Sequence, residues 1–210
     1  SSTVRLRQLL QGEGCLTMPC CFDALSARLI EHAGFPLTFM SGFAVSAARA
    51  ALPDTGLLSV TEMIDQGRSI CDAVSIPVIG DGDTGYGNPV NVHRTVAQYA
   101  RAGFAGIMIE DQVAPKRCGH TGVKEVVERF DAVRRIRAAI AARDGTDLVV
   151  VARTDARSAL ERTLGAEGAL DEAIWRMQAF ADLGADLLFL EAPRSEAEME
   201  RFCREVPGVR

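Results

Sequence analysis

The 210-residue sequence lacks the features that mark several common classes of protein. It has only three histidines, and its six cysteines are scattered without the paired spacing of a zinc site. No apolar stretch exceeds strand length, and the amino-terminal segment has no long apolar run. No GxGxxG dinucleotide-binding motif follows the first predicted strand. We therefore expect a soluble, cytoplasmic protein that has no membrane partner, no Cys/His zinc centre and no dinucleotide fold.

The charge balance is mildly acidic. The sequence has 23 Lys and Arg against 28 Asp and Glu, a net charge of -5, and no basic run. This composition argues against a nucleic-acid partner, because such partners require clustered positive charge. With 48% hydrophobic residues the chain can bury a substantial core, and residues 1–210 are predicted to form a single domain.

Short apolar segments alternate with longer amphipathic ones, which predicts parallel strands joined by helices. Six strands are expected, at Leu16–Pro19, Leu37–Ser41, Pro77–Gly80, Gly106–Ile109, Leu148–Ala152 and Leu187–Leu190. Helices are expected at Ala24–Ala33, Thr61–Ala73, Val90–Ala102, Val127–Arg143 and Leu170–Leu183. Three of these helices run into Gly34, Gly103 or Gly184, each a candidate left-handed cap.

A doubly wound sheet and a (β/α)₈ TIM barrel both fit this alternation. Polar residues follow at least five different predicted strands, as a barrel site requires, so the barrel is the expected fold. Only about six βα units are present in this chain. We therefore expect the C-terminal strands and helices of the barrel to lie beyond Arg210.

Carboxylates recur directly after four of the predicted strands. They are Asp81, Asp83, Glu110, Asp111, Asp155 and Glu191. For Asp81 and Asp83 alone, an Asp/Gly-rich turn would be the simpler interpretation. Repetition at successive strand ends instead predicts a converging acidic site that needs a cation, and oxygen ligands without Cys or His suit Mg²⁺, with Mn²⁺ possible. Arg153 is either a clamp for a substrate carboxylate or an ion-pair partner of Asp155 or Glu110.

A cationic segment, Lys116-Arg117-Cys118-Gly119-His120, lies in the loop after the fourth predicted strand. Its electropositive surroundings favour the reactive form of the Cys118 thiol, so this residue is a candidate nucleophile or proton donor. Pro115 and the nearby glycines predict a loop that changes its order when ligand binds.

Five sequence blocks together resemble a known family. In order they are SGFAVSAARAALPDTGLLS, GDGDTGYGN, GIMIEDQVAPKRCGH, VVARTDA and LFLEAP. They are similar to the isocitrate lyase/phosphoenolpyruvate mutase superfamily, and most to the branch with 2-methylisocitrate lyases, petal-death-type 2-alkylmalate and oxaloacetate lyases, and carboxyphosphonoenolpyruvate phosphonomutases. The resemblance implies a (β/α)₈ barrel in a homotetramer, arranged as a dimer of dimers.

The resemblance also implies residue roles. The metal is expected at Asp54, Asp81, Asp83 and Glu110, with Asp81 nearest the ion. Substrate is expected at Ser41, Gly42, Phe43, Gly119, His120, Arg153 and Glu191. Catalysis is expected to involve Glu110, Lys116, Cys118, His120 and Arg153.

The implied reaction is Mg²⁺-dependent retro-aldol cleavage of a small 2-hydroxy di- or tricarboxylate, giving an enolate that Cys118 protonates. The substrates considered are 2-alkylmalate, 2-methylisocitrate and oxaloacetate, with an α-keto acid as product or ligand. Phe39 replaces a tyrosine typical of methylisocitrate lyases, which favours the 2-alkylmalate or oxaloacetate type. A phosphonomutase or an oxaloacetate decarboxylase of the same superfamily is the alternative.

Overall fold

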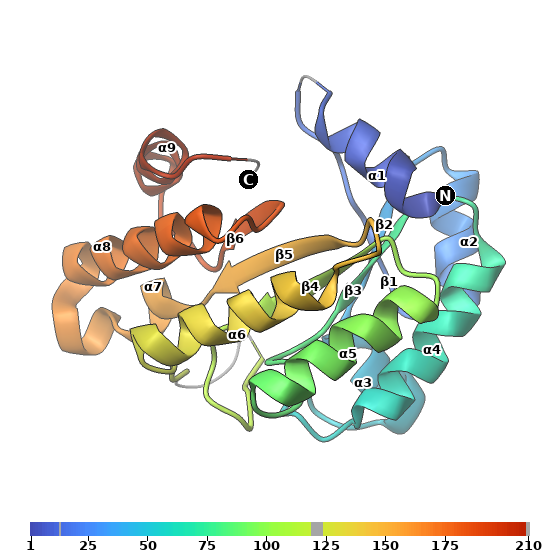
Figure 1. Cartoon of the computed structure of the whole chain (residues 1–210), viewed down its shortest axis with the longest axis horizontal. Helices are drawn as coiled ribbons and strands as arrows, with labels where there is room; N and C mark the ends of the chain where they lie inside the picture. Colours follow the sequence, from blue (N-terminus) through green and yellow to red (C-terminus); the bar gives the residue numbers. More distant parts are fainter. Residues whose placement is uncertain (13, 119–123, 209–210) are drawn as a thin grey trace.

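A computed structural model describes residues 1–12, 14–118 and 124–208, and its centre is one six-stranded parallel sheet (Figure 1). The strands pair in chain order, each with the next. They are β1 (Cys20–Cys21), β2 (Thr38–Met40), β3 (Val78–Asp81), β4 (Gly106–Glu110), β5 (Val149–Thr154) and β6 (Leu187–Leu190). Parallel neighbours require a crossover connection, so every strand ends at the same edge of the sheet. The predicted α/β class with six βα units is confirmed, and the six strands do not close on themselves.

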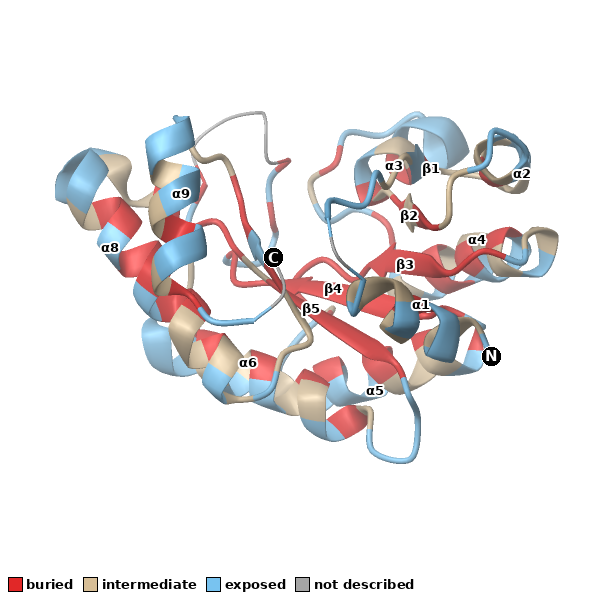
Figure 2. Ribbon diagram, turned by 90° about the horizontal axis from the view of Figure 1, so that it is seen from above, coloured by how far each residue is buried: buried red, intermediate tan, exposed pale blue. Residues whose placement is uncertain are grey.

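Most of the helices cover the outer face of this sheet in chain order, whereas the amino-terminal helix packs against its inner core (Figure 1). The helices are α1 (Ser2–Leu10), α2 (Ala24–His32), α3 (Gly42–Ala50), α4 (Val60–Ala73), α5 (Pro89–Arg101), α6 (Arg129–Ala142), α7 (Ala156–Ala159), α8 (Glu161–Asp182) and α9 (Glu196–Glu205). Seen from above, β3, β4 and β5 are buried, with α5 and α6 along their outer side (Figure 2). In the described ranges, no helix combines the length and the apolar character that crossing a bilayer would require.

The strands are apolar on both faces, because each face of the sheet has its own core. Ile107 and Ile109 belong to the core beneath the helices, whereas Met108 lies between them in sequence and belongs to the inner core. The inner core also contains Leu6 of α1, which is fully buried. Each such apolar side chain contributes roughly 1.5–3 kcal/mol by its removal from water. Burial on both sides explains why the strands lack apolar/polar alternation.

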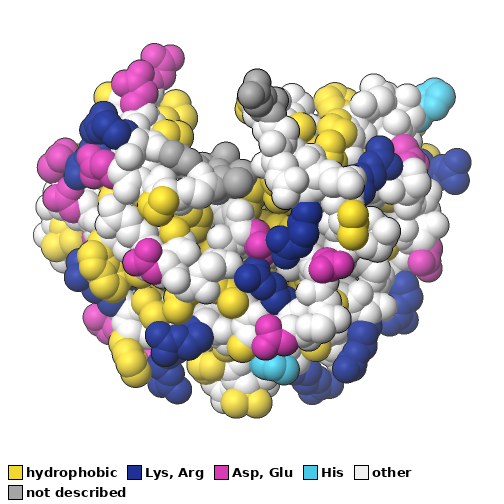
Figure 3. Space-filling model, turned by 45° about the horizontal axis from the view of Figure 1, so that its top comes forward, with side chains coloured by type: hydrophobic (Ala, Val, Ile, Leu, Met, Phe, Trp, Pro, Cys, Tyr) yellow, Lys and Arg dark blue, Asp and Glu magenta, His cyan; other side chains and the backbone are white. Residues whose placement is uncertain are grey.

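An apolar hollow of about 570 Å³ remains on the inner side of the sheet, between α1 and β6. Its walls include Leu9, Leu16, Leu37, Ile79, Leu187 and Phe189. In the space-filling view the upper edge of the molecule is indented, and hydrophobic side chains are visible below the indentation (Figure 3). The hollow contains none of the predicted site residues in its lining. Its position fits a sheet that curves but remains open between β6 and β1.

The predicted strands agree with the structure except at the first. β6 has the predicted bounds, and β2 to β5 differ from prediction by one or two residues at an end. The first strand was predicted at Leu16–Pro19, which is wrong. Pairing with β2 places the ladder at Cys20–Cys21, because the Phe39 amide donates to the Pro19 carbonyl and the Ser41 amide to the Cys21 carbonyl. Among the helices, α1, α3, α7 and α9 were not predicted.

Candidate active site

The predicted carboxylates meet at the carboxyl edge of the sheet. Asp81 ends β3, Glu110 ends β4, Asp155 directly follows β5 and Glu191 directly follows β6. All four side chains are buried. Their neighbouring strands are paired in register, with Glu110 opposite Arg153. The repeated strand-end position therefore does what the sequence predicted and brings these groups to one place.

Asp81 is held in place by backbone amides. Its Oδ2 accepts a hydrogen bond from the Gly42 amide at 3.0 Å, and its Oδ1 accepts one from the Asp83 amide at 3.1 Å. The Tyr99 hydroxyl of α5 donates to the Asp81 carbonyl at 2.7 Å. A Cβ at position 42 would lie 2.8 Å from Oδ2, so glycine permits this close approach. The Asp81 carboxylate is thus fixed before any ligand arrives.

Asp83 and Lys116 form a buried ion pair. The Lys116 Nζ lies 2.8 Å from Asp83 Oδ1 and 2.5 Å from Asp54 Oδ1. Asp83 has a left-handed backbone with φ of 47°, a conformation that costs energy for a non-glycine residue. Burial, with Asp81 adding to it, raises the pKa of Asp83 to about 6, although Lys116 acts to lower it. Burial alone would lower the pKa of Lys116, but the surrounding carboxylates outweigh it and raise that pKa, so the ammonium stays charged.

Glu110 and Arg153 form the centre of a second group of charges. Arg153 Nε lies 3.2 Å from Glu110 Oε2 and 2.9 Å from Asp155 Oδ2, and its terminal nitrogen lies 3.4 Å from Glu191 Oε2. The other oxygen of Glu110, Oε1, is buried and has no hydrogen-bond partner among the described residues. Burial raises the pKa of Glu110 well above its usual range even though Arg153 opposes this. Glu110 therefore offers an unused acceptor to the site.

Lys124 is a member of the site that the sequence did not reveal. Its Nζ lies 2.7 Å from Asp155 Oδ1 and 3.5 Å from Glu191 Oε1, and the side chain is buried. Burial raises the pKa of Asp155, but the neighbouring Arg153 and Lys124 outweigh it and hold that pKa below its usual range. The sequence contained one indication of such a residue, because several predicted strand-end carboxylates near a single arginine call for a further cation at the site.

The loop after β4 brings Lys116 to the site and buries Cys118 two residues further along. Lys116 and Cys118 are buried, whereas Arg117 between them is exposed. The Lys116 ammonium reaches the carboxylates, as described above, and Cys118 is 6% exposed. Gly119 and His120 lie outside the described residues, so their predicted contacts stay predictions.

The predicted carboxylate-binding residues lie where β2 passes into α3. Ser41 caps this helix, and its Oγ accepts a hydrogen bond from the Ala44 amide at 3.3 Å. The Gly42 amide already donates its hydrogen bond to Asp81. Phe43 is 55% exposed, and its amide, in the first turn of α3, is its part best suited to an anion. A helix amino terminus favours negative charge, which fits the predicted role of this segment.

The site carries more acid than base. Its six carboxylates, at Asp54, Asp81, Asp83, Glu110, Asp155 and Glu191, face three cations, at Lys116, Lys124 and Arg153. Across residues 1–12, 14–118 and 124–208, no three His, Cys, Asp or Glu side chains converge closely enough to form a metal cage. The excess of negative charge and the unpartnered oxygen of Glu110 nevertheless fit a hard cation, and Mg²⁺ typically uses one or two carboxylates and keeps several waters.

Three comparisons with known proteins bear on this site. The 2,3-dimethylmalate lyase of Eubacterium barkeri is 41% identical over 208 residues, which are 99% of this chain and 69% of the relative. The solved structure of an oxaloacetate acetylhydrolase with the inhibitor 3,3-difluorooxalacetate has a TM-score of 0.89 and 38% identity, covering 98% of this chain and 68% of that one. A phosphonopyruvate hydrolase in complex with oxalate and Mg²⁺ has a TM-score of 0.84 and 36% identity, covering 99% of this chain and 69% of that one.

The family itself is established by these likenesses. The chain spans 60 to 69% of the length of the first curated relatives that it matches. The family model described as phosphoenolpyruvate phosphomutase matches residues 6–210. The prediction of an enzyme family that includes carbon–carbon lyases is confirmed. This chain belongs to the phosphoenolpyruvate mutase/isocitrate lyase superfamily.

Proposed function

We propose that this site belongs to a Mg²⁺-dependent carbon–carbon lyase that cleaves a small 2-hydroxy di- or tricarboxylate of the 2-alkylmalate type, or oxaloacetate after water has added to its 2-keto group and supplied the 2-hydroxyl. The single observation that carries the proposal is the contact of the Lys116 ammonium, from the loop after β4, with Asp54 and Asp83 of the acidic cluster, with the buried Cys118 two residues further along the same loop. Relatives named for 2,3-dimethylmalate and oxaloacetate support the substrate class.

Asp81 and Glu110 are the residues proposed to lie nearest the Mg²⁺ ion, and Mn²⁺ would suit the same oxygens. Asp81 is fixed by two amides, and Glu110 has an oxygen without a partner. Asp54 and Asp83, which both contact the Lys116 ammonium, would hold water molecules bound to the ion. When bound, the ion would polarise the carbonyl that forms during cleavage.

The proposed substrate is oriented by cationic and amide donors. Arg153 presents a guanidinium, whose fork geometry suits a carboxylate, and the start of α3 presents the Phe43 amide. Ser41 and Gly42 shape this turn, and Glu191 holds Arg153 from the other side. These groups would place the 2-hydroxyl group near the acidic cluster.

The proposed reaction is a retro-aldol cleavage with a proton removed at one end and supplied at the other. The 2-hydroxyl proton passes to a carboxylate of the acidic cluster. The carbon–oxygen double bond forms, the adjacent carbon–carbon bond breaks, and its electron pair remains on the leaving carbon as an enolate. The Cys118 thiol then donates its proton to that carbon, and Lys116 keeps the charge around the loop balanced.

A second candidate remains within the same family. The matching family model is described as phosphoenolpyruvate phosphomutase, and a phosphonopyruvate hydrolase has a similar structure. Oxaloacetate decarboxylase of Paraburkholderia xenovorans is also a relative, at 37% identity. A phosphorus–carbon or decarboxylation reaction would use the same carboxylates and would not need the Cys118 thiol as the acid. We also propose, on the family resemblance, that the whole protein is a cytoplasmic homotetramer.

A substrate panel tests the proposal directly. The full-length protein with Mg²⁺ is incubated with 2-alkylmalates, 2-methylisocitrate, isocitrate, oxaloacetate and phosphonopyruvate, and products are identified by mass spectrometry. We expect cleavage of a 2-alkylmalate or oxaloacetate, and a Cys118→Ser variant with kcat lower by about 100-fold or more but with near-normal affinity for oxalate. Full turnover by Cys118→Ser, or phosphonopyruvate as the best substrate, would replace the lyase with the alternative reaction.

A further inference from the structure

Three consecutive polar residues at the end of β4 contact three different parts of the site. Glu110 faces Arg153, and Asp111 accepts hydrogen bonds from the Thr154 hydroxyl and the Asp155 amide of the β5 end. Gln112 contacts neither group of charges. It is 1% exposed, and both ends of its side-chain amide are used on the loop that follows. A buried amide with two such contacts has a specific structural task.

The Gln112 side chain binds both backbone groups of a single loop residue. Its Nε2 donates to the Arg117 carbonyl at 3.0 Å, and its Oε1 accepts from the Arg117 amide at 3.0 Å. One side chain thereby supplies the donor and the acceptor that a neighbouring strand would supply. The Arg117 side chain is exposed and takes no part in this pair of hydrogen bonds.

The residue held in this way separates the two predicted catalytic residues of the loop. Lys116 is 5% exposed and Cys118 is 6% exposed, while Arg117 is exposed. This alternation is that of extended backbone, in which residues two apart point to the same side. Fixing the Arg117 backbone therefore fixes the direction of both neighbouring side chains. Lys116 accordingly reaches Asp83, whose carboxylate lies on a different strand end.

Gln112 is itself anchored to the fold. It forms an antiparallel bridge with Val126, and its carbonyl accepts a hydrogen bond from Arg135 of α6 at 2.8 Å. The same Arg135 group donates to the Glu110 carbonyl at 2.7 Å. The Val113 amide also donates to the Glu125 carbonyl at 2.9 Å. The Gln112 side chain that binds the loop thus belongs to the same anchored segment as Glu110.

We infer that Gln112 is a positioning residue: it acts through the Arg117 backbone to hold Lys116 against the acidic cluster and to fix the direction of the Cys118 side chain. The inference rests on the proposed function, in which these two side chains act on substrate. It requires no contact between Gln112 and substrate. Its consequence is that loss of the Gln112 amide should reduce the rate of the chemical step more than the binding of ligand.

Two substitutions and one control test this role. Gln112→Met keeps the length of the side chain and removes both hydrogen bonds, whereas Gln112→Glu keeps an acceptor for the Arg117 amide and removes the donor. Arg117→Ala changes the exposed side chain and keeps the backbone that Gln112 binds. The full-length variants are compared for kcat, KM, affinity for oxalate in the presence of Mg²⁺, thermal midpoint, and cleavage after Lys116 by a lysine-specific protease.

For Gln112→Met we expect kcat to fall by about 30-fold or more, with KM and oxalate affinity within about threefold of wild type. Cleavage after Lys116 should be about tenfold faster, because the loop backbone has lost its partner. Gln112→Glu should have a kcat and a cleavage rate between those of wild type and Gln112→Met. Arg117→Ala should stay within about twofold of wild type in kcat.

The protease measurement separates this inference from the proposed function. Faster cleavage in Gln112→Met, in a protein without any lyase activity, would support the holding role and would overturn the lyase. The inference itself is overturned if folded Gln112→Met keeps wild-type kcat and wild-type cleavage after Lys116. It is also overturned if kcat falls only in proportion to the folded fraction, and Gln112→Glu decides the same point if Gln112→Met does not fold.

Discussion

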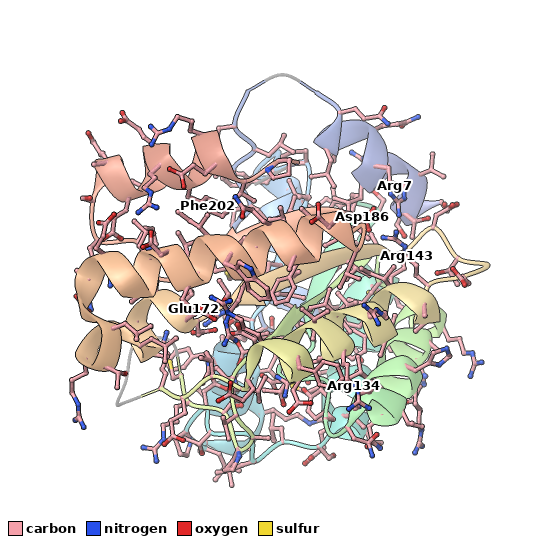
Figure 4. The ribbon with its side chains drawn as sticks, turned by 60° about the vertical axis from the view of Figure 1, so that its left-hand side comes forward. Arg7, Arg134, Arg143, Glu172, Asp186 and Phe202 are labelled. Atoms are coloured by element: carbon pink, nitrogen blue, oxygen red, sulfur yellow. The ribbon has the colours of Figure 1, made fainter. Side chains whose placement is uncertain are left out.

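The two ends of the sheet use the same kinds of charged residue in opposite ways. At the amino end, Asp186 directly precedes β6 and is bound by Arg7 at 2.9 Å, by Arg143, and by the Val150 amide at 2.8 Å. Figure 4 shows Arg7, Asp186 and Arg143 side by side. At the carboxyl end, carboxylates outnumber cations, and Glu110 keeps a buried oxygen without a partner among the described residues. At the amino end the carboxylate is surrounded by donors, whereas at the carboxyl end one carboxylate oxygen has none among the described residues.

The difference indicates where stability has been given up for function. A buried carboxylate that lacks enough donors lowers the stability of the fold, and such groups concentrate at sites that bind or react. The left-handed backbone of Asp83 adds strain at the same end. Arg7, by contrast, also donates to the carbonyls of Asp147 and Leu148, so the amino-end cluster ties α1 to the start of β5. Substitutions at the two ends should therefore have opposite consequences.

The largest expected effect is on ion binding at the carboxyl end. Asp81→Ala removes the carboxylate that the Gly42 and Asp83 amides hold in place. We expect the affinity for Mn²⁺ in the presence of oxalate, measured by calorimetry, to fall by about 100-fold or more. Asp186→Asn is the matched control, since it changes a half-buried carboxylate at the opposite edge of the sheet and should leave this affinity unchanged. Wild-type affinity in Asp81→Ala would remove Asp81 from the proposed metal site.

The next effect is a pH dependence of stability in the presence of a chelator. The folded pKa of Asp83 is about 6, above its ordinary value of 3.8, because burial and Asp81 favour the protonated form. The folded state then binds this proton more tightly than the unfolded state, so the stabilisation is complete below about pH 4 and is lost as the pH rises through about 6. The change is about 3 kcal/mol at most.

Urea unfolding between pH 4 and 8 measures this effect. Asp83→Asn should flatten the dependence and should be more stable than wild type at pH 7 without divalent ions. Asp65→Asn, at a largely exposed carboxylate, is the control and should leave the slope unchanged. A wild-type slope retained in Asp83→Asn would mean that another group causes it.

The sequence predicted the features of the two ends that depend on local patterns, and it missed those that depend on contacts between residues far apart in the chain. Strand periodicity and position placed Asp81, Glu110 and Glu191 at one edge, because parallel strands end together. The contact of Lys124 with Asp155 spans 31 residues, and no local pattern encodes it. The hydrogen bonds between Gln112 and the Arg117 backbone depend on the path of a loop, which no helix or strand periodicity in the sequence predicts.

The missed elements have a similar explanation. α1 carries two arginines among its apolar residues, and Leu6 is its one buried residue. The position of the helix therefore depends on the inner core that Leu6 joins, and the residues of that core come from distant strands. The displaced first strand depends on pairing with Phe39, which lies on another strand. Local propensity is a weak guide where such long-range pairing decides the outcome. The amino-end cluster of Arg7, Asp186 and Arg143 was missed for the same reason, since Arg7 and Asp186 are 179 residues apart.

The smallest of the three effects concerns that amino-end cluster and is purely one of stability. Asp186→Asn removes the charge that Arg7 and Arg143 share, leaving two cations near each other without their acid. Because the arginines are partly exposed and water can solvate them, we expect a loss of about 2 kcal/mol in the free energy of unfolding rather than the larger cost of a fully buried pair. Activity per folded molecule should stay within about twofold of wild type, since the cluster lies at the far edge of the sheet from the site. Urea unfolding and initial rates at low temperature measure both quantities, with Arg7→Gln as a second variant of the same cluster. If Asp186→Asn lowered kcat strongly while the protein remained folded, the two ends would be coupled and the division between a stabilising end and a reactive end would fail.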